Sequence, residues 1–253
     1  MLKLMKYEFI HSMRTFFIAF GVFLLGCLIF PFFVTLQIFV NIPVISVIFG
    51  IGFSVLILGI CIALFVSIFM NYYRSMFGKP SYLTLTLPVT SLQLIVAKVI
   101  MSIVWLVIGM FILVAGMFLM TITMALLENS LNLMDLWRGL GTMAYEFMSY
   151  IASNPVQLIV NILVFGTTLI FIVTSIYFSL TLTHTKWLRK HRVLFGVAVY
   201  FALNFIIEWM MDMCFGVYFT DTFSIGLALF YLVLDIGFIF ATTYIVDHYI
   251  EIE

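Results

Sequence analysis

Six long apolar runs, separated by short polar loops, make up most of this chain. An α-helix needs about 20 apolar residues to cross a hydrocarbon layer of about 30 Å, and each run is long enough. Strands of a β-barrel would instead appear as alternating segments of about ten residues. The pattern therefore predicts an all-α, polytopic membrane protein with six transmembrane helices. The predicted spans lie at about 16–40, 43–70, 94–124, 156–183, 193–217 and 223–246.

The composition agrees with a membrane as the solvent. Hydrophobic residues make up 65% of the 253 residues and charged residues only 9%, whereas a soluble domain carries about 25% charged residues. No internal repeat or low-complexity tract divides the sequence. Residues 1–253 are therefore expected to form a single transmembrane domain in contact with the lipid bilayer.

The basic residues orient the predicted spans. Ten of the 11 Lys and Arg residues fall at the N-terminus, in the second loop and the foot of the third span, or in the fourth loop. Only Arg138 lies on the other side. The positive-inside rule places the ten in the cytoplasm. Both termini are then cytoplasmic, and the long 125–155 segment lies outside.

Residues 1–14 form an amphipathic segment before the first span. Leu2, Met5, Phe9 and Met13 recur at helical spacing, with charged residues between them. This spacing predicts an N-terminal amphipathic interfacial helix along the cytoplasmic leaflet. The alternative is a short solvated lead-in to the first span.

The outer 125–155 segment is not a plain linker, because it mixes large apolar residues such as Trp137 with Asp135 and Arg138. A short amphipathic helix, lying on the membrane or capping the bundle, would bury these apolar residues. Gly139 and Gly141 are expected to end this helix. Pro155 is then expected to begin the fourth span as a first-turn proline.

The sequence lacks the common motifs of catalysis and nucleotide binding. It has no G-x-x-x-x-G-K-[ST] phosphate loop, no H-E-x-x-H zinc site and no G-x-S-x-G nucleophile elbow. No catalytic residue, metal site or cofactor bound by this chain is expected, so the chain itself is not predicted to be an enzyme. His184 and His191 are expected to be solvated interfacial residues. Nucleic acid is not an expected partner, because membrane topology accounts for the basic residues.

The loop predicted at 71–92 is unusually apolar for a cytoplasmic loop. Its aromatic and aliphatic side chains would face water, rimmed by Arg74, Lys79 and Lys98. An exposed apolar surface of this kind is typical of a docking site. Alternatively, the loop folds back onto the bundle or into the lipid headgroups.

Four stretches of the sequence carry a family resemblance. The runs 73–78 (Tyr-Arg-Ser-Met-Phe-Gly) and 82–89 (Tyr-Leu-Thr-Leu-Thr-Leu-Pro-Val), then Lys98, and the opening 1–9, resemble the permease subunits of bacterial ABC exporters of the second type. The six-span layout and the cytoplasmic termini extend the resemblance over nearly the whole chain. One departure is 79–81, Lys-Pro-Ser, where many relatives have acidic residues and a Gly.

The resemblance implies that 71–92 is a coupling loop that docks on a separate ABC ATPase subunit. That partner would bind ATP and magnesium. The residues implied in coupling are Tyr72, Tyr73, Arg74, Met76, Phe77, Tyr82, Leu83, Leu87 and Pro88. The N-terminal helix resembles the connecting helix of the family, which also touches the ATPase. A second permease, identical or homologous, would complete the pathway in the bacterial cytoplasmic membrane, and an amphipathic or hydrophobic substrate such as a peptide, a drug-like molecule or a lipid is expected.

Three acidic residues fall in or near the last two spans. Asp235 lies close to the predicted midplane, while Glu208 and Asp212 lie toward the outer side. A midplane carboxylate costs a few kcal/mol and suggests a function by default. A structural role would need a hydrogen bond to a Thr or Asn of a neighbouring span, for which Asn161 and Asn204 are candidates.

Two alternatives to the exporter remain open from the sequence. One is an ion-coupled secondary transporter that uses Asp235 and Glu208. Such a transporter would be expected to show inverted repeats, which the sequence lacks. The other is a membrane scaffold or immunity protein that transports nothing.

Overall fold

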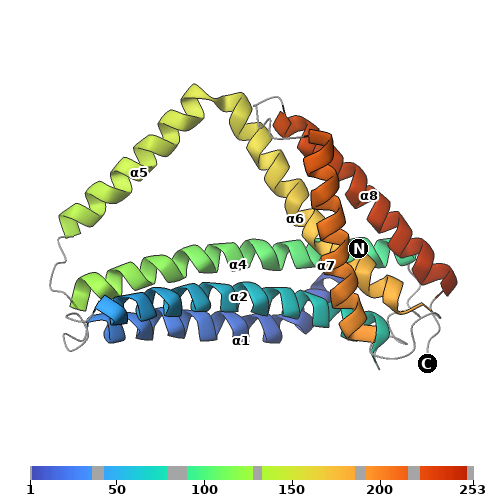
Figure 1. Cartoon of the computed structure of the whole chain (residues 1–253), viewed down its shortest axis with the longest axis horizontal. Helices are drawn as coiled ribbons and strands as arrows, with labels where there is room; N and C mark the ends of the chain where they lie inside the picture. The colour runs from blue at the N-terminus through green and yellow to red at the C-terminus, as the bar shows by residue number, and fades with distance from the viewer. Residues whose placement is uncertain are drawn as a thin grey trace. The chain divides into compact units, whose positions relative to one another are not determined.

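The computed structural model describes residues 2–35, 43–78, 90–127, 133–185, 192–215 and 223–249. All regular secondary structure in these ranges is α-helical (Figure 1). The helices are α1 (Leu2–Thr35), α2 (Pro43–Phe77), α4 (Ser91–Leu127), α5 (Leu133–Ser153), α6 (Pro155–Thr183), α7 (Arg192–Phe215) and α8 (Phe223–Tyr249).

Within the described ranges, six helices are long and apolar enough to cross a membrane. The prediction of an all-α, multi-pass membrane protein is therefore confirmed. The candidate spans are Met5–Phe33, Ile51–Phe77, Ser91–Leu127, Pro155–Thr183, Leu194–Met213 and Ile225–Tyr249. At the end of the second span, α2 continues to Phe77 instead of ending near residue 70.

The interfacial helix predicted at 1–14 is helical from Leu2 onward, but it forms the first turns of α1 and not a separate element. No Gly or Pro occurs before Gly21. Because these are the residues that most readily interrupt a helix, nothing in this sequence forces a break ahead of the first span.

Helix α5 is longer than the short helix predicted in the outer segment. It extends from Leu133 to Ser153 and passes through Gly139 and Gly141, so the prediction that these glycines end it is wrong. A glycine inside a helix costs only about 1 kcal/mol relative to alanine, which the surrounding turns can absorb. Pro155 begins α6 as predicted, and Asn154 alone separates the two helices.

Packing divides the chain into two compact units. The first unit contains Met1–Ile10, Ile68–Val104 and Pro155–Glu253. The second unit contains His11–Ser67 and Trp105–Asn154. Helices α1, α2 and α4 contribute to both units, and each unit is described by itself below.

Trp105 of α4 anchors α1 in the second unit. Its indole stacks on Phe16 with ring centroids 4.6 Å apart and an interplanar angle of 2°. The indole N–H also donates a hydrogen bond of 2.8 Å to the Ser12 hydroxyl. A buried Trp usually needs a partner for this N–H, so ring packing and polar satisfaction both hold α1 against α4.

Glycines allow the three helices of the second unit to approach closely. A Cβ atom at Gly26 of α1 would lie 2.8 Å from a Leu56 methyl group of α2, and one at Gly109 of α4 would lie 2.8 Å from a Leu64 methyl group. A Cβ atom at Gly116 of α4 would collide with the Phe23 ring of α1. Small residues at such positions are typical of helix packing in membranes, where close van der Waals contact drives association.

Helix α6 is the centre of the first unit, and Figure 1 shows α7 and α8 alongside it. Contacts between aromatic rings join α6 to α8. The ring centroids of Phe171 and Tyr231 are 4.9 Å apart, and Phe178 stacks on Phe238 with centroids 5.0 Å apart. On the α7 side, a Cβ atom at Gly196 would lie 3.1 Å from a Leu180 methyl group.

The buried hydroxyl groups of α6 bond to the backbone of the same helix. Ser179 donates to the Ser175 carbonyl at 2.6 Å, and Thr181 donates to the Tyr177 carbonyl at 2.7 Å. Unsatisfied polar groups are costly in hydrocarbon. These internal bonds explain how a span can carry many Ser and Thr residues.

We expect Gly116→Ala to destabilise the protein. The added methyl group has no space beside Phe23, and overpacking of this kind costs about 1–3 kcal/mol. Thermal unfolding of the purified protein in detergent measures the effect. The matched control is Gly59→Ala in α2, where nothing lies within 4 Å of the added atom. Equal unfolding midpoints for the two variants would contradict the close approach of α1 and α4.

Candidate functional site

The end of α2 carries all five of the described residues implied in coupling. Tyr72 and Met76 are each only 1% exposed, so the expectation that they face water is wrong. Tyr73 and Phe77 are partly exposed, and Arg74 is exposed. The reason is that α2 stays helical to Phe77, so residues three or four apart share a buried face.

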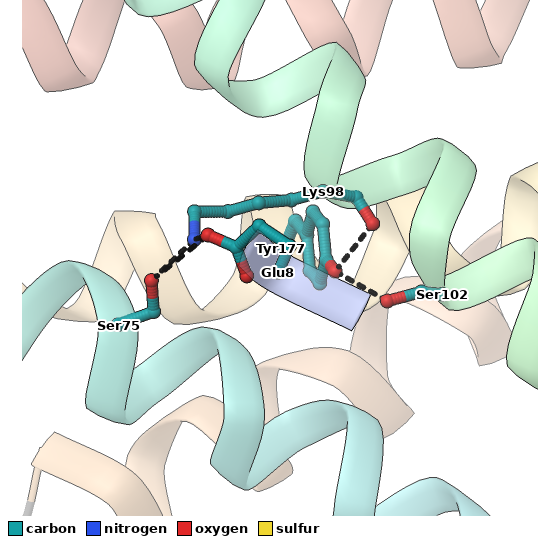
Figure 2. A network of polar contacts seen from close by, with 5 residues as sticks. All are labelled: Glu8, Ser75, Lys98, Ser102 and Tyr177. Carbon is teal, nitrogen blue, oxygen red and sulfur yellow. Dashed lines mark hydrogen bonds and ion pairs between the residues drawn. The ribbon is translucent and has the colours of Figure 1, made fainter. Parts of the chain in front are cut away.

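Lys98 of α4 is buried at the centre of a polar network (Figure 2). Its ammonium group forms an ion pair with the Glu8 carboxylate of α1 and donates a hydrogen bond to the Ser75 hydroxyl of α2. The Ser75 hydroxyl in turn donates to Glu8 at 3.5 Å. The side chains of Lys98 and Glu8 are only 3% and 12% exposed. The prediction that Lys98 rims an exposed loop is therefore wrong.

Tyr177 of α6 extends the network (Figure 2). Its hydroxyl donates to the Lys98 backbone carbonyl at 3.3 Å. The Ser102 hydroxyl lies 2.6 Å from the same oxygen. Because the Tyr177 proton is directed at the carbonyl, Ser102 is the donor in this pair. Lys98 is thereby linked to α6 through its backbone as well as to α1 and α2 through its side chain.

Tyr72 joins α2 directly to α6. Its ring stacks on Tyr177 with centroids 3.9 Å apart and an interplanar angle of 13°. Its hydroxyl lies 2.8 Å from Thr181 Oγ1. Since the Thr181 proton is donated to the Tyr177 carbonyl, Tyr72 is the donor to Thr181. Both rings are almost fully buried, so this end of α2 is fixed to α6.

His184, just after α6, covers the last turn of α2. Its ring stacks on Phe77 with centroids 3.9 Å apart and lies 5.4 Å from the Tyr73 ring. His184 is buried, so the prediction of a solvated histidine is wrong. Its Nδ1 lies 2.8 Å from the Leu180 carbonyl. Because a carbonyl only accepts, Nδ1 carries the proton.

The ends of α4 and α8 are also joined. The Ser91 hydroxyl, at the start of α4, donates a hydrogen bond to the Asp247 carboxylate near the end of α8. This contact is exposed, unlike the network around Lys98. The first unit thus connects five helices, α1, α2, α4, α6 and α8, through side chains near one end of each.

Asp235 is a separate polar site within the first unit. It is 4% exposed, and the Thr174 hydroxyl of α6 donates to its Oδ1 at 2.9 Å. Its Oδ2 has no hydrogen-bond partner among the described residues. The side chain therefore faces α6 and not lipid. Of the Thr or Asn partners considered from the sequence, Thr174 makes the bond, and the Asn204 amide instead donates to the Tyr200 carbonyl.

The other predicted site residues fall into two groups. Glu208 and Asp212 of α7 are exposed, unlike Asp235. Tyr82, Leu83, Leu87 and Pro88 lie outside the described residues, as does His191. In the part of the chain that the structure describes, no group of three or more His, Cys, Asp or Glu residues is placed to hold a metal ion.

No protein-family model, curated protein or solved structure matches this chain. The function is therefore inferred from its residues and contacts.

The sequence did not predict the ion pair between Glu8 and Lys98, because 90 positions separate them and no local pattern links them. The sequence nevertheless contains one signal of this pair. Lys98 is a charged residue within an apolar run, and such a residue is expensive unless it is paired. The contacts of Ser102, Tyr177 and Thr181 had no comparable signal.

We expect Lys98→Met to destabilise the protein by about 3–5 kcal/mol, because it removes one partner of a buried ion pair. The double variant Glu8→Leu/Lys98→Met should recover most of this loss, since apolar groups of similar volume can replace such a pair. Thermal unfolding in detergent measures all the variants. Lys6→Met, at an exposed lysine of α1, is the control and should change stability by less than about 0.5 kcal/mol. A Lys98→Met variant as stable as this control would contradict the buried pair.

For Asp235, we expect Thr174→Val to destabilise the protein by about 1–3 kcal/mol, because it removes the hydroxyl bonded to a buried carboxyl. Asp235→Asn keeps an acceptor oxygen and should stay close to the wild type. Thr168→Val is the matched control, since the Thr168 hydroxyl bonds only within α6, to Val164, among the described contacts. Unfolding midpoints in detergent compare the variants. Equal losses for the two Thr variants would show that the bond to Asp235 contributes nothing.

Proposed function

We propose that this chain is the membrane-spanning subunit of an ATP-driven ABC exporter. It moves an amphipathic or hydrophobic substrate, such as a peptide, a drug-like molecule or a lipid. A separate ABC ATPase subunit binds ATP and magnesium, and a second permease, identical or homologous, completes the pathway. The chain itself performs no catalysis.

One observation carries this proposal. The resemblance lies partly in the separate stretches 1–9, 73–78 and Lys98, and each contributes a residue to the same buried network (Figure 2). Glu8, Ser75 and Lys98 hold the ends of three helices together. A surface that receives force from a partner needs such a fixed arrangement, which a set of independent loops would not provide.

The same contacts narrow the surface available to the ATPase. Tyr72 and Met76 are buried, so their role is to hold the end of α2. Arg74 is exposed, and Tyr73 and Phe77 are partly exposed. In this proposal these three residues, and not the buried pair, meet the ATPase.

The buried contacts also supply a route for the motion. ATP binding closes the ATPase dimer and displaces the end of α2. The Tyr72–Tyr177 stack passes this displacement to α6, and the Lys98 network passes it to α1 and α4. The two permeases then alternate between inward-open and outward-open arrangements.

The proposed location is the bacterial cytoplasmic membrane, with both termini in the cytoplasm. The ten-to-one distribution of basic residues supports this orientation. The ion-coupled alternative has weaker support. Asp235 is buried against Thr174, Glu208 is exposed, and no hydrogen bond joins the two acids among the described contacts.

We expect Arg74→Glu to release the ATPase without unfolding the permease. Arg74 is exposed at the end of α2, so charge reversal should lower the affinity about tenfold, which corresponds to about 1.4 kcal/mol. The measurement is co-purification of an ABC ATPase with the tagged chain from its native cells, with the complex quantified by mass analysis. Met76 is unsuitable for this test, because a charge at that buried site would unfold the protein.

The matched control is Arg138→Glu, the same reversal at the basic residue predicted on the other side of the membrane. It should leave the amount of bound ATPase unchanged. Equal recovery with both variants would place the docking site away from Arg74. If no ATPase co-purifies with the wild-type chain, the exporter proposal itself fails.

A further inference from the structure

Helix α5 separates its apolar and polar side chains onto two faces. Met143, Phe147 and Met148 are 69%, 60% and 66% exposed. At about 100° per residue, these three side chains fall on one side of the helix. Thr142, Glu146 and Ser149 fall on the other side and are also exposed. The structure thus shows an apolar face of large side chains that the described chain does not bury.

The polar face of α5 needs no protein partner. The Thr142 hydroxyl donates to the Gly139 carbonyl at 2.9 Å, and the Ser149 hydroxyl donates to the Glu146 carbonyl at 2.8 Å. Both groups are therefore satisfied within the helix. Tyr145 and Tyr150, exposed at the boundaries between the faces, have the amphipathic rings that gather at the level of lipid headgroups.

We propose that α5 lies along the membrane surface, with Met143, Phe147 and Met148 among the lipid headgroups and the ends of the acyl chains. A helix that has separate apolar and polar faces and a small net charge is suited to this position. The exposure of this apolar face is the reason to prefer a membrane-surface helix to the other possibility open from the sequence, a cap over the bundle.

The connections of α5 support a surface position. Asn154 alone joins it to α6, and only residues 128–132 join it to α4. The 21 residues of α5 extend about 32 Å at 1.5 Å per residue. Five connecting residues reach at most about 18 Å, so both ends of α5 stay close to the ends of the helices that it joins.

The charges of α5 identify the kind of lipid surface that suits it. The helix carries Asp135, Arg138 and Glu146 and has a net charge of −1. It therefore lacks the basic face that attracts anionic lipids. Apolar burial alone must hold it, so a neutral phosphatidylcholine surface is sufficient.

The test uses the full chain in phosphatidylcholine nanodiscs, with its three native cysteines replaced. Nitroxide labels are placed singly at Met143, Phe147 and Met148 and at Thr142, Glu146 and Ser149. Collisions with oxygen report lipid, and collisions with a water-soluble nickel chelate report water. The first three labels should favour oxygen and the second three should favour nickel, and addition of anionic lipid should leave this difference unchanged.

Two results would overturn the proposal. Equal access of nickel to all six labels would place α5 in water. Protection of the apolar three from both reagents would mean protein contact, either with the bundle or with a second copy of this chain.

A second comparison tests whether the apolar side chains hold α5 in the lipid. Met143→Asp/Phe147→Asp should expose a label at Met148 to nickel, whereas the control Thr142→Asp/Ser149→Asp should not. Unchanged protection after the first pair of substitutions would also contradict a lipid-held helix. Because no ATPase is present, failure of this proposal leaves the exporter proposal untouched.

Discussion

The arrangement of the first unit depends on one buried ammonium group. Removing a lysine from water is expensive unless a charge and hydrogen bonds replace its hydration. Lys98 obtains these from Glu8 and Ser75, and its backbone carbonyl receives the Tyr177 hydroxyl. Four helices are therefore held around one residue of α4. Such networks are strong only when every member is satisfied, which makes loss of any one helix end costly to the others.

The two units hold their helices by different balances of interactions, although the second unit also has a hydrogen bond between helices, from Trp105 to Ser12. In the second unit, Gly26, Gly109 and Gly116 allow neighbouring side chains to fill the space against the helix backbone. In the first unit, Lys98 and Asp235 join helices through charged or polar groups. The first kind of contact depends on shape and the second on hydrogen bonding. The described residues that carry the resemblance, in 2–9 and 73–78 and at Lys98, all belong to the first unit.

The sequence predicted the six spans because the length of an apolar run alone decides whether a helix can cross a membrane. It failed where the outcome depended on distant neighbours. The sequence places Tyr72 and Met76 in water only if 71–92 is a loop, and it places Lys98 at the rim of that loop because Glu8 lies far away in sequence. The prediction that the glycines of α5 end the helix is wrong for another reason, because a helix with enough favourable turns continues through them. Asp235 was intermediate: its need for a hydroxyl or amide partner was predictable from its depth, but the choice of Thr174 was not.

The order of the bonded residues along the sequence also affects how the chain enters the membrane during synthesis. Thr174 is synthesised before Asp235, and until α8 emerges its hydroxyl can bond to the Phe171 carbonyl of its own helix, 3.2 Å away. Glu8 likewise precedes Lys98, and near the start of the chain it can remain in water until α4 arrives. In both pairs the earlier residue is satisfied without its partner, by its own helix or by water. The later residue, which is costlier to bury alone, meets its partner as it enters the membrane. These two contacts therefore suit insertion from the N-terminus onward, because the partner of each later charge is already in place.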